Sequence, residues 1–268
     1  EGERLNMEDN IQEMYQKARV AFKTVEFWPQ EKVDEMVLAV GWELQKKETA
    51  EELARLAVQS GIGVFEDKVH KIGTKVRGTL YDQIGVKTCG LVEEDKAKGI
   101  RKYAKPIGVI ANVVPCTNPE STVCCIALST LKTRNAIICS PHPRTEAATY
   151  ATVEHVRKAL AKVGAPVDLV QCIRHTSNEK TQELMANCDY AVATGGAALV
   201  KVVYAAGVPA QTVGAGNVIS IVDATVEDDI PGIAFRLRKS KTANNAASCS
   251  SENAVAIEEC IFDKMIGA

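Results

Sequence analysis

One cysteine lies in a segment whose composition suits a reactive thiol. Cys249 stands in residues 241–253, among small polar residues, with no charged or bulky side chain within two positions. A nucleophilic sulfur needs exposure, room for a substrate and backbone N–H groups close to its thiolate. Cys124 and Cys125, by contrast, lie in an apolar run that suits packing in a core. The pattern therefore indicates Cys249 as the nucleophile of an enzyme.

Four short loops combine proline, glycine and polar side chains in a way that suggests ligand contact. They read Pro-Cys-Thr-Asn-Pro at 115–119, Ser-Pro-His-Pro-Arg at 140–144, Thr-Gly-Gly at 194–196 and Gly-Ala-Gly-Asn at 214–217. None is the G-x-G-x-x-G fingerprint of a standard dinucleotide fold. Thr-Gly-Gly at the start of a helix would let a phosphate approach backbone N–H groups. A tight turn without a ligand explains the same residues about as well.

The elements that must position these residues change in character along the chain. Residues 1–70 carry apolar side chains at helical spacing, whereas the weak periodicity of 71–105 predicts an irregular crossing with an exposed hairpin at 89–105. From residue 106, apolar runs alternate with amphipathic ones, and Ser177 is the expected N-cap of one helix. Strands are expected at 107–114, 136–139, 169–173, 190–193 and 218–222, and helices at 121–134, 145–163, 178–187, 197–206 and 226–239.

Apolar strands separated by helices predict an α/β fold built on a doubly wound, mostly parallel sheet that is covered on both faces. Ligands of such sheets bind beyond the carboxyl ends of the strands. Chemistry is therefore expected in the four loops.

Composition excludes several classes of function. The chain has 268 residues, with 32 basic and 34 acidic ones and no basic stripe, which argues against nucleic acid as a partner. Its apolar runs are too short for a membrane span, and its first residues do not resemble a signal peptide. Nine cysteines without C-x-x-C pairs indicate reduced thiols in a cytoplasmic protein. Cys139 and His142 form one C-x-x-H, but no second ligand pair follows, so no metal site is expected.

Taken in order, the loops resemble the aldehyde dehydrogenase superfamily. The order is P-x-x-N-P, S-P-H-P-R, A-T-G-G and V-G-A-G-N, followed by the segment that holds Cys249. More narrowly, the chain resembles the CoA-acylating branch, which includes acylating acetaldehyde, succinate-semialdehyde and sulfoacetaldehyde dehydrogenases. The resemblance implies a nicotinamide-binding domain at 1–240, with an oligomerising hairpin near 89–105, and the start of a catalytic domain at 241–268.

The resemblance also implies a role for each matching residue. Cys249 would add to the aldehyde carbon and then carry a thioester, while Asn118 and the backbone N–H of Cys249 hold the oxyanion. His142 and Arg144 match the loop that meets the adenosine ribose. The other residues implied at the cofactor site are Pro115, Thr117, Thr194, Gly195, Gly196, Val213 and Gly214. Without the resemblance, an Asx turn at Asn118 and a plain loop histidine at His142 explain these residues at least as well.

Val213 distinguishes two branches of the superfamily. Hydrolytic aldehyde dehydrogenases resemble this chain at 213–216 but carry a glutamate, which activates water, where Val213 stands. Valine cannot accept a proton, so water loses its general base. A thiol such as coenzyme A supplies some thiolate at neutral pH and attacks a thioester without that help. The sequence therefore predicts an acyl-CoA product, made reversibly.

The chain also departs from the branch. Ala243-Asn244-Asn245 stands where relatives often have Phe-Asp-Asn, which predicts a gap beside the nucleophile and an altered pocket. Family members are longer, and the first residue is not Met, so the chain is expected to be a fragment. Arg144 permits NADP, yet relatives with a similar loop use NAD. We expect NAD or NADP as the cofactor, with NAD favoured, and coenzyme A as co-substrate.

Three functions are compatible with the sequence. The first is CoA-acylating oxidation of an aldehyde by a homo-oligomer, and the small polar residues around Cys249 suit a short or anionic aldehyde. The second is reduction of an acyl phosphate, as in the glutamyl-phosphate reductases of the same superfamily, which need no coenzyme A. The third is a truncated subunit or interaction module, in which Cys249 would be no more reactive than Cys260.

Overall fold

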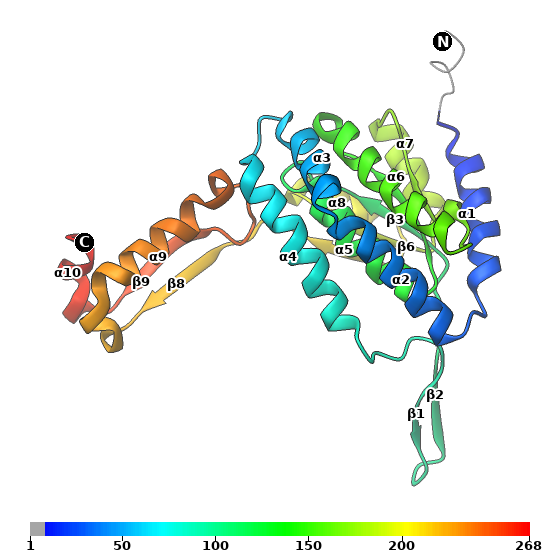
Figure 1. The fold of residues 1–268 in the computed structure, drawn as a ribbon, viewed down its shortest axis with the longest axis horizontal. Helices are drawn as coiled ribbons and strands as arrows, with labels where there is room; N and C mark the ends of the chain where they lie inside the picture. Colours follow the sequence, from blue (N-terminus) through cyan, green and yellow to red (C-terminus); the bar gives the residue numbers. More distant parts are fainter. Residues whose placement is uncertain (1–8) are drawn as a thin grey trace.

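The computed structural model describes residues 9–268 and consists of a layered body, a thin hairpin and a long arm (Figure 1). A parallel sheet of five strands forms the centre of the body, in the order β5-β4-β3-β6-β7. The strands are β3 (Val109–Val113), β4 (Ala136–Ser140), β5 (Val170–Cys172), β6 (Tyr190–Thr194) and β7 (Ala210–Val213). The first three are buried along their whole length, as expected for parallel strands that are covered on both faces.

Helices cover both faces of this sheet. The α5 (Pro119–Lys132) and α6 (Glu146–Lys162) connections run towards β5, whereas α7 (Asn178–Asn187) leads back across to β6. Right-handed crossovers therefore place α7 on the face opposite α5 and α6, and α1 (Ile11–Val25) packs beside α7. An outer layer of α2 (Gln30–Gln45), α3 (Lys47–Val58) and α4 (Phe65–Gln83) covers α5 and α6. The expected doubly wound α/β fold is confirmed.

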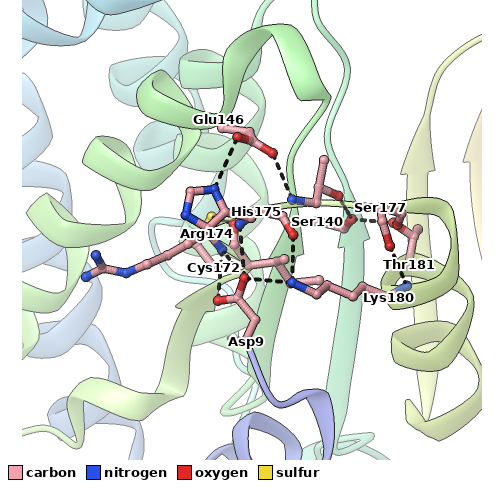
Figure 2. A network of polar contacts seen from close by, with 11 residues as sticks. Asp9, Ser140, Glu146, Cys172, Arg174, His175, Ser177, Lys180 and Thr181 are labelled. Atoms are coloured by element: carbon pink, nitrogen blue, oxygen red, sulfur yellow. Dashed lines mark hydrogen bonds and ion pairs between the residues drawn. The ribbon is translucent and has the colours of Figure 1, made fainter. Parts of the chain in front are cut away.

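A polar network fastens the start of the described chain to the carboxyl ends of β4 and β5 (Figure 2). The Asp9 carboxylate accepts hydrogen bonds from the backbone N–H groups of Arg174 and His175, at 3.1 and 2.9 Å. Ser140 Oγ lies 2.7 Å from Thr181 Oγ1. The expected N-cap is present as well, since Ser177 Oγ accepts from the backbone N–H three residues on. These bonds fix the loop that follows β5.

Of the two expectations for residues 71–105, the exposed hairpin and the irregular crossing, only the hairpin is found in the structure. The hairpin is confirmed, because β1 (Gly90–Asp95) and β2 (Ile100–Ala104) pair antiparallel and project away from the body (Figure 1). The irregular crossing expected from residue 71 is wrong, because α4 is one helix through residue 83. Its buried residues are Lys68, Ile72 and Val76, at a spacing of four. A lysine inside this stripe and two glycines in the helix obscured the apolar pattern.

The strand expected at 218–222 forms, but it does not belong to the main sheet. The fifth strand of that sheet is β7, which has only four half-exposed or exposed residues and was therefore missed. Instead, β8 (Val218–Val222) pairs in parallel with β9 (Glu252–Ile257). Between them, α9 (Ile230–Thr242) begins later than expected, because residues 224–229 form a 3-10 turn first.

Residues 218–268 form an arm that extends from the body (Figure 1). The arm has its own small apolar cluster, built from Val222, Ile230, Ile261 and Met265, apart from the core of the body. The division expected at residue 240 would cut through α9. We therefore propose that the catalytic part begins near residue 217. None of the helices described between residues 9 and 268 is long and apolar enough to cross a membrane.

Candidate active site

The loop after β3 presents Asn118 at the carboxyl end of the sheet. Asn118 is buried and immediately precedes Pro119, the first residue of α5, but its side chain makes no capping bond to that helix. Its Oδ1 accepts a hydrogen bond from Lys71 Nζ at 3.0 Å instead. The alternative of an Asx turn is therefore not what the structure contains. The amide of Asn118 belongs to a contact between distant parts of the chain.

Lys71 joins Asn118 to the segment that carries the candidate nucleophile. It lies on α4, and its Nζ also donates to Ser248 Oγ at 2.7 Å, one residue before Cys249. Burial lowers the pKa of the Lys71 ammonium, whereas the Glu120 carboxyl and the Cys249 thiol favour its charged form. One lysine thus links the two residues on which the sequence placed the chemistry.

The loop at 214–217 lies against the backbone of Cys249. A Cβ atom on Gly216 would stand only 2.6 Å from the Cys249 carbonyl oxygen, so this close approach requires glycine. Asn253 Nδ2 donates to the Gly216 carbonyl oxygen at 3.3 Å. The Gly-x-Gly pattern drew attention to this loop in the sequence. The structure shows why the second glycine is needed: a side chain there would collide with the backbone of Cys249.

The residues that precede Cys249 adopt a rare conformation. Asn244, Asn245 and Ala246 have φ values of 51°, 53° and 55°, in the left-handed region that β-carbon-bearing residues usually avoid. Asn244 holds this segment: its Oδ1 accepts from Val64 N at 2.9 Å, and its own N–H donates to Asp67 Oδ2 at 2.6 Å. A buried asparagine therefore anchors the segment to the start of α4.

A buried ion pair supports the Asn118 loop from behind. Lys68 and Glu120 are both fully buried, with 3.5 Å between Nζ and Oε1. Lys68 Nζ also donates to the Thr117 carbonyl oxygen at 2.9 Å. Burial raises the pKa of the Glu120 carboxyl, and Lys68 acts in the opposite direction. The pair fixes the backbone that leads into Asn118.

The residues expected at the cofactor lie in three groups, of which the first is at the ends of β6 and β7. Thr194 pairs with Val213 across β6 and β7, and Gly195 N donates to the Val213 carbonyl oxygen at 3.0 Å, so these residues and Gly214 lie together. Gly196 is the N-cap of α8 (Ala197–Ala205), and no side chain caps that helix. A Cβ on Gly196 would meet nothing within 4 Å. The open, uncapped start of α8 fits the phosphates of a dinucleotide.

The second group lies where β4 ends. His142 Nδ1 accepts from Arg144 N at 3.2 Å, which makes this histidine the cap of a short 3-10 turn. Burial and the Arg144 charge lower the pKa of His142. The Arg144 guanidinium donates to the Ser60 carbonyl oxygen. Within residues 9–268, no hydrogen bond connects this group to the Thr194 turn. Pro115 and Thr117 belong to the Asn118 loop instead.

Exposure separates the cysteines. Cys249 and Cys260 are exposed, whereas Cys124, Cys139, Cys172 and Cys188 are buried. Burial raises the pKa of the Cys139 thiol to about 12 and that of Cys124 well above its usual value. These buried thiols remain protonated and unreactive at neutral pH. No group of three or more His, Cys, Asp or Glu side chains that could hold a metal ion occurs in the described part of the chain.

Sequence reasoning missed Lys71, Lys68 and the anchoring role of Asn244. Each of them acts through a contact between residues that are far apart in the chain, such as the 177 positions between Lys71 and Ser248. A signal for Lys68 did exist, since it stands four residues before the apolar Ile72 and so continues the buried stripe of α4. No local pattern marks Lys71.

Comparison with known proteins identifies the family. The profile of the aldehyde dehydrogenase family matches residues 4–268, so the chain belongs to this family. A sulfoacetaldehyde dehydrogenase of an Acholeplasma species is 42% identical over 253 residues, which are 94% of this chain and 52% of that protein. The acetylating succinate-semialdehyde dehydrogenase of Clostridium kluyveri is 38% identical over 266 residues, 98% of this chain and 58% of that protein.

Solved structures give the same result. An acetylating aldehyde dehydrogenase from Geobacillus thermoglucosidasius matches with a TM-score of 0.91 and 33% identity, over 96% of this chain and 57% of that one. A Rhodopseudomonas palustris propionaldehyde dehydrogenase, solved with bound CoA and an acylated cysteine, matches with a TM-score of 0.85 and 27% identity, over 97% and 59% of the two chains. The expected resemblance to the acylating branch is confirmed. The chain spans little more than half the length of these relatives.

Proposed function

We propose that the protein oxidises a short, anionic aldehyde to its acyl-CoA, reversibly and with NAD or NADP, through a thioester on Cys249. The observation that carries the proposal is the junction of Asn118, Lys71 and Ser248, which gathers an amide, a cation and the exposed cysteine segment at the carboxyl end of the sheet. Both relatives named above act on aldehydes that carry an acidic group, sulfonate or carboxylate. These relatives favour an anionic aldehyde as the substrate.

The proposed reaction begins with an attack by Cys249. Its thiolate sulfur forms a bond to the aldehyde carbon, and the carbonyl electron pair moves to oxygen. The side-chain amide of Asn118, which is buried, and the backbone N–H of Cys249 stabilise this oxyanion. The oxyanion then re-forms the carbonyl as the carbon loses a hydride, and Cys249 is left as a thioester.

The second half of the reaction transfers the acyl group. The thiolate of coenzyme A attacks the thioester carbon, the bond to Cys249 Sγ breaks, and the cysteine thiolate is regenerated. Val213 offers no base that could activate water instead. Glu120, the acidic residue nearest to Asn118 in the chain, is fully buried and paired with Lys68, so its carboxyl is poorly placed for that task. These features favour coenzyme A over water as the acyl acceptor.

The cofactor residues have complementary tasks in the proposal. A nicotinamide dinucleotide, when bound, supplies the hydride acceptor. The turn at Thr194, Gly195 and Gly196 would hold its phosphates at the start of α8, and His142 with Arg144 would lie towards its ribose. Pro115, Thr117, Val213 and Gly214 would border the nicotinamide end. A Cβ at Gly195 would stand 2.6 Å from Leu199 Cδ2, so a larger residue there would require the leucine side chain to shift.

An assay with the intact natural protein tests this function. Sulfoacetaldehyde, succinate semialdehyde and acetaldehyde are each supplied with NAD or NADP, with and without coenzyme A, and products are identified by mass. We expect reduced cofactor and acyl-CoA only when coenzyme A is present, with the anionic aldehydes favoured, and loss of both products in Cys249→Ala. Turnover that ignores coenzyme A and yields free acid would contradict the proposal. A requirement for phosphate instead would favour acyl-phosphate reduction.

The hairpin supports a proposal that the protein is a homo-oligomer. Leu91, Ile100 and Tyr103 are apolar residues of β1 and β2 that remain exposed on a two-stranded ribbon away from the body. An isolated ribbon of this kind has little stability of its own. Light scattering of the purified protein should therefore report a dimer or a larger assembly, and replacing Ile100 by Lys should shift it towards smaller species.

A further inference from the structure

We propose that Lys71 is the positioning residue of the active site: its ammonium orients the Asn118 amide and holds the segment of Ser248 and Cys249 beside it. This inference rests on the proposed function and adds a residue to it. The geometry carries it, because one Nζ atom donates to Asn118 Oδ1 at 3.0 Å and to Ser248 Oγ at 2.7 Å.

The first consequence concerns the orientation of the Asn118 amide. An asparagine side chain has an acceptor end, Oδ1, and a donor end, Nδ2, and an ammonium group can only donate. Lys71 therefore selects the orientation in which Oδ1 faces it, since the flipped amide would set N–H against N–H. This leaves Nδ2 as the end that is available to an oxyanion. Asn118 makes no bond to its own helix that could fix the amide otherwise.

The second consequence concerns the nucleophile segment. Ser248 is the neighbour of Cys249, so its bond to Lys71 ties the cysteine backbone to α4 next to Asn118. The Cys249 thiol in turn favours the charged form of the Lys71 ammonium. The other groups that act on the Lys71 ammonium are Glu120, which favours its charge, and Lys68 and Lys75, which oppose it.

The surroundings prepare Lys71 for this role. Lys68, one turn earlier on α4, is fully buried and satisfied by Glu120 and the Thr117 carbonyl oxygen. Lys75, one turn later, is exposed. Only the middle lysine of the three points its ammonium at both Asn118 and the cysteine segment. Lys75 is therefore a matched control on the same helix.

The kinetic test is a double-mutant cycle in the intact natural protein. Asn118→Ala should lower kcat by about 100-fold or more, as for loss of an oxyanion donor. Lys71→Met should lower kcat by about 10-fold, with a smaller change in KM, and Lys71→Arg should recover part of this loss. In the Asn118→Ala background, Lys71→Met should cost less than about 3-fold, because coupled residues are not additive. Fully multiplicative effects, or equal rates for Lys71→Met and Lys75→Met, overturn the orientation role.

A second readout needs no turnover. Iodoacetamide alkylation of each thiol is followed by peptide mass from about pH 6 to about pH 10 in the wild type, Lys71→Met and Lys75→Met, with circular dichroism to verify folding. We expect Lys71→Met to change the rate of Cys249 alkylation by about 3-fold or more near pH 7, because the segment loses the bond of Ser248 to α4, with Cys260 unchanged. Identical Cys249 profiles in Lys71→Met and Lys75→Met overturn the role of Lys71 at the cysteine. If the wild type forms no acyl-CoA, the proposed function fails while this comparison still decides the inference.

Discussion

At the scale of single residues, the site combines charged groups that water does not reach. Lys68 and Glu120 have no exposed surface, and removing one partner of such a pair leaves the other uncompensated. Burial raises the pKa of the Glu120 carboxyl, and the Lys68 ammonium opposes that rise. The bonds that this pair makes to the backbone at 117–120 explain why an ion pair with a high desolvation cost is buried at this position. It fixes the loop from which Asn118 reaches Lys71.

The identity of residue 213 gives the sharpest test at this scale. Val213 ends β7 and is 47% exposed, so a larger polar side chain can replace it without filling the core. We expect Val213→Glu to raise CoA-independent release of free acid by about 10-fold or more, because a placed general base contributes roughly 10²–10⁴-fold. Acid is measured by mass after incubation with aldehyde and cofactor. Val213→Gln is the control of equal shape, and equal acid release by both variants would refute the argument.

At the scale of elements, α4 is the part of the body that organises the site. Its first turn receives the Asn244 anchor and carries Lys68, its second carries Lys71, and its later turns pack on α5. The glycine before this helix is under a steric constraint. Gly63 has a φ of +89°, and a Cβ there would lie 2.4 Å from Asn244 Oδ1. Side chains at this position would displace the anchor.

Two glycine replacements near and within α4 should therefore have opposite effects. Gly63→Ala should lower the free energy of unfolding by about 1–3 kcal/mol, because it combines a left-handed backbone with a clash. Gly78→Ala, in the interior of α4 with nothing within 4 Å, should raise it by about 0.5–1 kcal/mol. Urea unfolding followed by circular dichroism measures both. A stabilising Gly63→Ala would show that the Asn244 anchor does not constrain this position.

The elements also show what the sequence alone can and cannot predict. The apolar run at Val109–Val113 and the cap at Ser177 have local causes, so strands, helices and loops of the body were predictable from them. The continuation of α4 beyond residue 70 was not, because Lys68 occupies a core position through a partner 52 residues away and two glycines interrupt the apolar pattern. The edge strand β7 was not predictable either, since none of its four residues is buried and no apolar run marks it. Cys249 was predicted from the small polar residues around it and Asn118 from the resemblance, whereas Lys71 required the fold.

At the scale of the whole molecule, the body and the arm differ in the size of their buried apolar cores. The body holds a continuous core from α1 to α8, whereas the arm holds four buried apolar residues. Ile221, on the arm strand β8, remains 82% exposed. A part of the chain with so small a core should open more readily than the body.

Hydrogen exchange of the 268-residue chain tests this difference. We expect backbone amides of β8 and β9 to exchange at least about 10-fold faster than those of β3 and β4, because local opening exposes little apolar surface in the arm. Exchange followed by peptide mass resolves the two regions. Equal protection of arm and body would contradict the division that we place near residue 217 and would favour one cooperative unit.

The hydrogen bonds that anchor Asn244 to the start of α4 also determine the order in which parts of the chain fold. One of them joins positions 180 residues apart, so the segment before Cys249 can adopt its left-handed turns only after α4, α5 and the sheet exist to receive it. During synthesis, α4 is complete long before the cysteine is added, and closing so long a loop costs entropy that only a finished partner surface can offset. The thiol of Cys249 therefore reaches its place beside Asn118 only after the body has folded.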